Sequence, residues 1–144
     1  DLEFHDINAS ELSQKDLIGH VESLDQSSIL LYILCSNDKD GNVYASAESV
    51  QMLSSRARIP VFSGIAIGMG QGLLGGKIVS HEKMGEIAGQ MASKILDGGV
   101  CESMAVVQDS PMIYCFDENV MKRFDISRSM LPDNAKIINH KVAL

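Results

Sequence analysis

The chain has 144 residues, of which 45% are hydrophobic and 22% are charged, and its formal net charge is −7. This length suits one domain or one large lobe, and no apolar run approaches the roughly 18 residues that a membrane helix needs. We expect no nucleic-acid partner, because basic residues form only one weak cluster, Lys122, Arg123 and Arg128. Any membrane attachment should come from segments outside this sequence.

Expected strands and helices alternate through the first hundred residues. Residues 4–8 are expected to form a strand, and Ser13 followed by Asp16 indicates a helix start. Residues 28–34 are a continuous apolar run, which is typical of a strand buried on both faces in a parallel sheet. A turn should follow at residues 37–41.

The second helix and third strand come next. Ser46 is placed to cap a helix that carries Val50, Leu53 and Ala57 on one face, and Pro60 ends that pattern. Residues 59–62 then read as a short strand. The alternation predicts an α/β fold, a three-layer lobe with a parallel sheet.

Residues 64–76 contain six glycines, at positions 64, 68, 70, 72, 75 and 76. A dinucleotide-binding fingerprint fails here, because Leu73 stands where its third glycine belongs. A phosphate-binding P-loop also fails, because Gln71 and Ile78 occupy positions that need Gly and Ser or Thr. Two interpretations stay open, a tightly turned crossover and a loop that lines a ligand site.

The strongest helical pattern begins after an expected strand at residues 77–80. Apolar residues recur at helical spacing from Met84 to Leu96, with Ser80 as the cap and Gly98 just past the end. The small residues Gly85, Gly89 and Ser93 should allow another backbone to approach closely. Beyond residue 99 we expect strands at 104–108, 112–116 and 136–140 and a helix at 118–124.

Motifs for metal or catalytic chemistry are incomplete. The segment from residue 36 resembles a calcium loop, but Ser36 and Ala47 are wrong ligands at its two ends. His81 begins an HExxH pattern whose second histidine is missing. The isolated His5, His20 and His140 read as surface or partly buried residues. We therefore expect no metal, no cofactor and no enzymatic activity in this segment.

Three cysteines complete the set of candidate residues. Cys35 ends the apolar run and reads as a small buried hydrophobic residue. Cys101 and Cys115 could pair in an oxidising compartment, but spacing alone leaves this open.

Four segments together resemble a known family. They are the run 28–34 followed by Asp38, Gly41 and Glu48; the strand Ile59–Ser63; the stretch Gly70–Gly76 with Ser80, Gly85, Ala88 and Ile95–Gly98; and Phe116-Asp117 with Met121, Lys122-Arg123, Ile126 and Leu131-Pro132. Nearly the whole chain resembles the C-terminal part of sensor domains similar to the substrate-binding proteins of ABC transporters. Such domains precede bacterial histidine kinases and diguanylate cyclases.

The resemblance implies a type I periplasmic-binding-protein fold, with two lobes and a ligand cleft between them. Residues 1–100 would form the second lobe, and residues 101–144 would be a return segment that packs on a first lobe this sequence mostly lacks. Ligands of open α/β sheets bind beyond the carboxyl ends of strands. The residues carried over as ligand-binding are Asn37, Asp38, Ser63, Gly64, Ile65, Gly70 and Gly72.

The implied function is a small-molecule sensor module of a membrane-bound bacterial signalling protein, on the periplasmic or extracytoplasmic side. The alternative is the substrate-binding component of an ABC transporter. Residues 63–66 lack the acidic or aromatic residue common after that strand, so the ligand class stays open. Without its first lobe the chain should expose apolar surface, and we expect it to form a homodimer.

Overall fold

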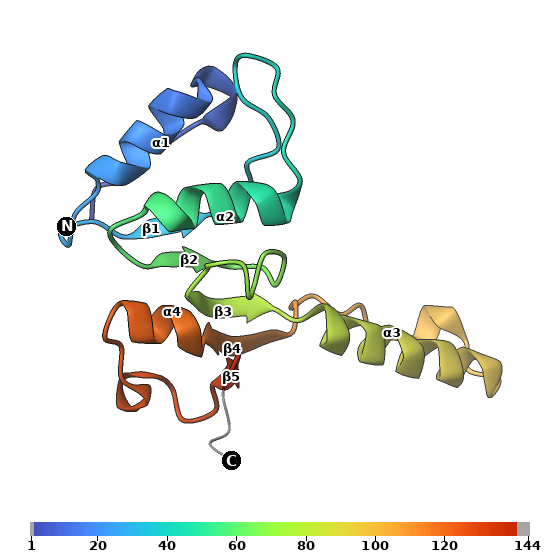
Figure 1. The fold of residues 1–144 in the computed structure, drawn as a ribbon. Helices are drawn as coiled ribbons and strands as arrows, with labels where there is room; N and C mark the ends of the chain where they lie inside the picture. Colours follow the sequence, from blue (N-terminus) through green and yellow to red (C-terminus); the bar gives the residue numbers. More distant parts are fainter. Residues whose placement is uncertain (1, 141–144) are drawn as a thin grey trace.

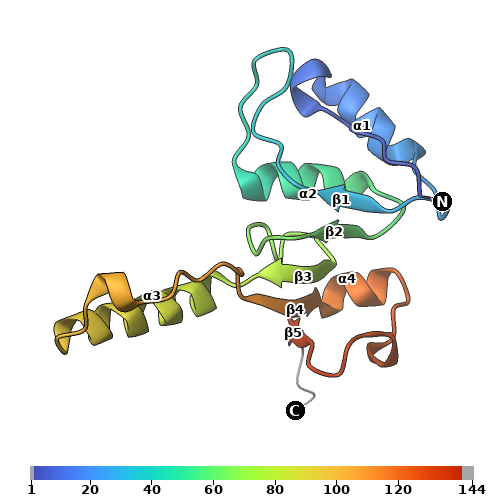
Figure 2. The same cartoon turned by 180° about the vertical axis from the view of Figure 1, so that it is seen from behind.

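Helices lie on both faces of a five-stranded sheet in the computed structural model, which describes residues 2–140 (Figure 1 and Figure 2). The helices are α1 (Gln14–Ser23), α2 (Ser46–Arg56), α3 (His81–Leu96) and α4 (Glu118–Arg123). The strands are β1 (Leu30–Tyr32), β2 (Val61–Ser63), β3 (Gly75–Val79), β4 (Met112–Asp117) and β5 (Lys136–Ile138). Short 3-10 turns are η1 (Ala9–Glu11), η2 (Cys101–Ser103) and η3 (Arg128–Met130).

The strands lie side by side in the sheet in the same order as in the chain, from β1 to β5. Neighbouring strands are parallel from β1 to β3, β4 is antiparallel to β3, and β5 is parallel to β4. The carboxyl ends of β1, β2 and β3 therefore lie together along one border of the sheet, formed by the ends of the strands and here called the carboxyl edge. The carboxyl ends of β4 and β5 lie along the opposite border. The expected α/β fold with a mainly parallel sheet is confirmed.

Two apolar clusters cover the two faces of this sheet. Successive side chains of a strand point to opposite faces. Val61 belongs to the cluster beneath α1 and α2, whereas the next residue, Phe62, belongs to the cluster beneath α4. Through its strand pairing, the row of Phe62 continues across the sheet to Phe116 and Ile137. The result is the three-layer arrangement that the sequence predicts.

The prediction that residues 28–34 are buried on both faces is wrong. β1 is only three residues long and is the outermost strand on one side of the sheet. Tyr32 is 7% exposed on the face covered by α2, but Leu31 is 56% exposed, and the flanking Ile29 and Ile33 are 73% and 72% exposed. The cluster beneath α4 includes no β1 residue, so this row is left uncovered by residues 2–140.

Several helix ends agree with their sequence signals. The hydroxyls of Ser13 and Ser80 cap α1 and α3 by accepting hydrogen bonds from the backbone N–H groups of Asp16 and Lys83. Gly98, at φ 93°, follows the end of α3 in the left-handed conformation. The N-cap of α2 is Ala45, one residue before the expected Ser46. Short polar side chains and glycine thus mark these boundaries to within a residue.

Residues 4–8 and 104–108 form no strand, contrary to prediction. A strand depends on a neighbouring backbone for its hydrogen bonds. Neither segment pairs with another described strand. A short apolar pattern was therefore not enough to predict a strand at either place.

Residues 80–111, here called the arm, project away from the sheet (Figure 1 and Figure 2). The arm consists of α3, η2 and the segment that returns to β4. The predicted helix is confirmed, but no residue of α3 is buried. A Cβ added at Gly85 or Gly89 would meet nothing within 4 Å, so the expected close backbone approach does not occur among the described residues. In the same residues, no helix has the length and apolar character required to cross a membrane.

The predicted division at residue 100 stays a prediction. β4 and β5 extend the sheet formed by β1, β2 and β3, and the arm is the part that stands apart from it (Figure 1).

Candidate functional site

Five of the seven predicted ligand-binding residues follow or end strands at the carboxyl edge. Asn37 and Asp38 come after β1, Ser63 ends β2, and Gly64 and Ile65 follow it directly. Ile65 forms an isolated bridge with Val79 at the end of β3. The loops after β1 and β2 and the end of β3 therefore lie at the same edge.

Asp38 organises the loop after β1. Its buried carboxylate accepts hydrogen bonds from the backbone N–H groups of Asp40 and Asn42, the Asn42 amide at 2.7 Å and the Tyr44 hydroxyl at 2.6 Å. The bonds from Asn42 and Tyr44 lower the pKa of Asp38 to about 2, and the bond to Asp38 raises the pKa of Tyr44 to about 12. The carboxylate is thus engaged within its own loop, and contact with a ligand stays a prediction.

The turn after β2 has a closed side and an open side. The hydroxyl of Ser63 accepts from the backbone N–H of Ile65 and donates to its carbonyl, both at 3.2 Å, and Ser63 is buried. The carbonyl of Gly64 accepts from the backbone N–H of Val79 at 2.9 Å. A Cβ added at Gly64 would meet nothing within 4 Å. Gly64 therefore offers open space at the carboxyl edge.

Gly70 and Gly72 belong to the crossover that runs from β2 to the start of β3. Gly72, at φ 118°, lies so close to α2 that an added Cβ would overlap the side chain of Ser54. A Cβ at Gly68 would lie 2.7 Å from Cγ2 of Val50. A Cβ at Gly70 would instead lie 3.8 Å from Nδ2 of Asn139, which follows β5. The structure favours the close-turn interpretation for this crossover, and it separates Gly70 and Gly72 from the turn at Gly64.

The arm leaves and rejoins the sheet at adjacent positions on the carboxyl edge. Val79, the last residue of β3, pairs with Met112, the first residue of β4. One step further, the backbone N–H of Ser80 donates to the carbonyl of Pro111 at 2.9 Å. Two chain connections therefore stand side by side next to the open turn at Gly64.

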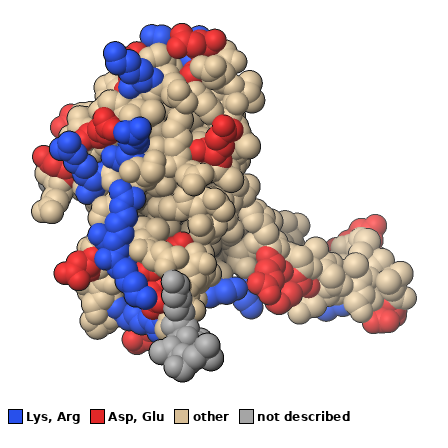
Figure 3. All heavy atoms as spheres, viewed as in Figure 1, with Lys and Arg blue, Asp and Glu red and all other residues tan. Residues whose placement is uncertain are grey.

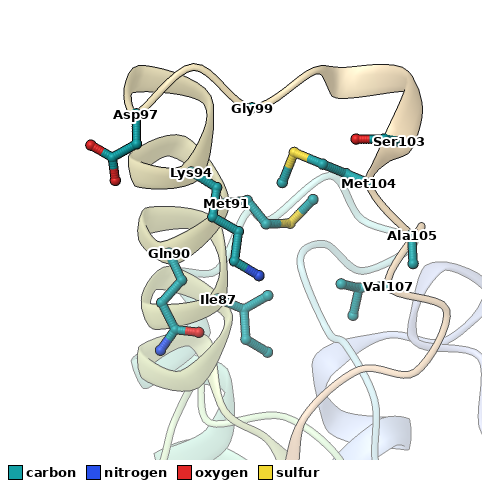
Figure 4. A pocket seen from close by; sticks show the side chains of 10 residues that line it. All are labelled: Ile87, Gln90, Met91, Lys94, Asp97, Gly99, Ser103, Met104, Ala105 and Val107. Atoms are coloured by element: carbon teal, nitrogen blue, oxygen red, sulfur yellow. The ribbon is translucent and has the colours of Figure 1, made fainter.

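An open groove of about 600 Å³ lies between α3 and the returning segment of the arm. Figure 4 shows Met91 and Met104 pointing toward one another, with Ile87 and Val107 further along the groove. Lys94 and Gln90 add polar groups. Sequence reasoning identified the helix face but not the groove, because residues 104–108 were expected to form a strand.

A polar cluster at the opposite edge was missed by sequence reasoning. Asp117 ends β4, and its buried carboxylate accepts from the backbone N–H of Asn119 and from Nδ2 of Asn139, both at 2.9 Å. Asp117, directly after the expected strand 112–116, was an available signal. Asn139 instead fell within the expected strand 136–140, which ends at Ile138 in the structure, and pairing of β4 with β5 was needed to bring the two residues together.

Glu118 is the centre of an ion-pair network beside this cluster. Its carboxylate lies 3.1 Å from Nδ1 of His140, 3.0 Å from Nζ of Lys122 and 2.7 Å from Nη2 of Arg128. Hydrogen bonds from His140, Lys122 and Arg128 lower the pKa of Glu118 to about 2. His140 is therefore not isolated as the sequence suggested, and the network ties the end of β5 to α4.

The cysteines are free. Cys35 is buried, as expected, and Cys115 is also buried, whereas Cys101 is exposed on the arm. Burial raises the pKa of the Cys35 and Cys115 thiols. Among residues 2–140, no group of three or more His, Cys, Asp or Glu side chains is arranged to hold a metal ion.

Comparison with known proteins leaves the relationship to any family open. No protein-family model, no curated protein and no solved structure matches this chain. The resemblance to substrate-binding-protein-like sensor domains therefore stays a prediction.

Proposed function

We propose that this chain forms one wall of a small-molecule-binding cleft in an extracytoplasmic sensor domain of a bacterial signalling protein. The open turn at Gly64 and the exposed Asn37 lie on that wall. A facing lobe outside the described residues would supply the other wall.

The paired connection at the base of the arm carries this proposal. Ligands of open α/β sheets bind beyond the carboxyl ends of strands. The arm crosses that edge twice, at Val79–Ser80 and at Pro111–Met112. Two adjacent crossings are a suitable hinge for lobes that close on a ligand.

The surface of the arm supports a facing lobe. Its exposed apolar residues include Leu96 at 87%, Val106 at 81% and Val100 at 60% exposure. Exposed apolar surface of this extent is typical of a surface that packs against another unit.

A thermal-shift screen of the full-length protein tests the proposal, with amino acids, short peptides, sugars and nucleosides as probes. A true ligand stabilises the form that binds it and raises the unfolding temperature. Gly64→Phe should abolish the shift, because the new side chain projects into open space on the wall. The control is Gly19→Phe, on α1, where an added Cβ also meets nothing within 4 Å.

Two outcomes would overturn the proposal. One is the absence of any shift across the four classes of compound. The other is a shift that Gly64→Phe leaves unchanged, since the ligand would then bind elsewhere.

A further inference from the structure

The segments that carry the four arginines of the chain lie on one side of the molecule (Figure 1). Arg56 and Arg58 flank the end of α2, Arg123 ends α4, and Arg128 begins η3. With Lys122 they form what we call the basic stripe, and Figure 3 shows Lys and Arg atoms running down this side of the surface. This arrangement contrasts with the net charge of −7.

Hydrogen bonds connect the elements that carry the stripe. The guanidinium of Arg123 donates to the carbonyls of Ser54 and Ala57, both at 2.8 Å, and so lies against the end of α2. Lys122 and Arg128 both contact the carboxylate of Glu118. These contacts hold the end of α2, α4 and η3 next to one another.

Much of its positive charge is not neutralised. Carbonyl groups hold Arg123 in place without cancelling its charge, and Arg58 has no ion-pair partner within residues 2–140. Arg56 has only an exposed contact of 3.5 Å with Glu22. Glu118 is shared between Lys122, Arg128 and His140.

We propose that the basic stripe binds a short acidic segment of a partner protein. The planar guanidinium group matches carboxylates geometrically. A flexible acidic peptide can follow a narrow stripe, whereas duplex nucleic acid and anionic membranes would also face the surrounding acidic surface. This proposal is independent of the ligand-binding proposal, because the stripe follows the carboxyl end of α2 and lies around α4, away from the turn at Gly64.

Fluorescence anisotropy with a labelled decaglutamate peptide tests the proposal on the full-length protein. Binding should occur at low ionic strength and weaken at about 0.15 M salt, as expected for exposed charges. The variant Arg56→Gln/Arg58→Gln should weaken binding roughly three- to tenfold, because two exposed ion pairs are lost. These residues are chosen because Arg123 and Arg128 also stabilise the fold.

The control variant is Lys83→Gln/Lys94→Gln on the arm, which changes the net charge by the same amount. It should leave the affinity within about twofold of wild type. Equal weakening in both variants, or no binding of decaglutamate at low salt, would overturn the proposal. Tighter binding of duplex DNA or phosphatidylserine vesicles, lost in the arginine variant, would also overturn it by assigning the stripe to phosphate groups.

Discussion

The hydroxyl of Tyr44 donates a hydrogen bond of 2.6 Å to the carboxylate of Asp38, and both residues are buried at the carboxyl edge. The same carboxylate holds the backbone of Asp40 and Asn42. Asp38 therefore sets the shape of the loop that precedes α2, and Tyr44 connects this loop to the core beneath α2.

Tyr44→Phe should lower the free energy of unfolding by about 1–3 kcal/mol, because a buried charged group loses one of its donors. Urea unfolding followed by circular dichroism would measure the change. Tyr114→Phe is a suitable control, since its hydroxyl makes no hydrogen bond among the described side chains. Equal stability of Tyr44→Phe and wild type would contradict the role assigned to Asp38.

Stability should fall as the pH is lowered from about 4.5 to 2. The pKa values of Asp38 and Glu118 are about 2 in the folded chain, below their ordinary values of 3.8 and 4.5. The unfolded chain therefore binds protons first, and acid favours unfolding across this interval. Urea midpoints measured over this pH range would show the decline.

Glu118→Gln separates the contribution of the ion-pair network to this acid sensitivity. It should flatten the decline below pH 4.5, whereas Asp109→Asn, which removes an exposed carboxyl group on the arm, should not. An unchanged pH profile in Glu118→Gln would contradict a contribution of the ion-pair network to the acid sensitivity.

Two glycine substitutions should differ in their effect on stability. Gly72→Ala should destabilise the fold by about 2–4 kcal/mol, because its Cβ overlaps Ser54 and its φ is positive. Gly64→Ala should change stability by less than about 0.5 kcal/mol, because its Cβ enters open space. Thermal unfolding of both variants measures the difference, and similar losses would contradict the assigned packing of the crossover.

Local sequence signals predicted where helices and strands form better than they predicted what packs against them. The periodicity from Met84 to Leu96 and the caps at Ser80 and Gly98 located α3, but could not show that its apolar face lies on a projecting arm. The run at residues 28–34 predicted a strand without revealing its position at the sheet edge. Hydrophobicity indicates that a side chain favours burial, whereas its actual burial depends on which other elements pack against it.

The positions of candidate site residues were predictable where they depend only on the order and direction of neighbouring strands. Parallel pairing of β1 with β2 places Asn37 and Gly64 at one edge, as the rule for carboxyl ends predicts. The contact between Asp117 and Asn139 was not predictable, since it joins residues 22 positions apart through β4 and β5 pairing. Gly70 and Gly72 were assigned to the ligand site through the family resemblance, and their residue type could not decide the matter because glycine serves both tight packing and ligand approach.

The exposed arm should drive self-association of the 144-residue chain. Light scattering should give a mass near twice 15.6 kDa at high concentration, because exposed apolar surface favours association. Leu96→Gln/Val106→Gln should shift the chain to the monomer. Both side chains are more than 80% exposed, so the substitutions should leave the fold unchanged.

The apolar row along β1 provides the matched comparison, since Ile29 and Ile33 are also more than 70% exposed. Ile29→Gln/Ile33→Gln should leave the dimer intact if the arm forms the interface. The converse result, in which only this pair gives monomers, would place the interface on the edge strand, where unpaired backbone groups can join a second sheet. A wild-type monomer at all concentrations would contradict both arrangements.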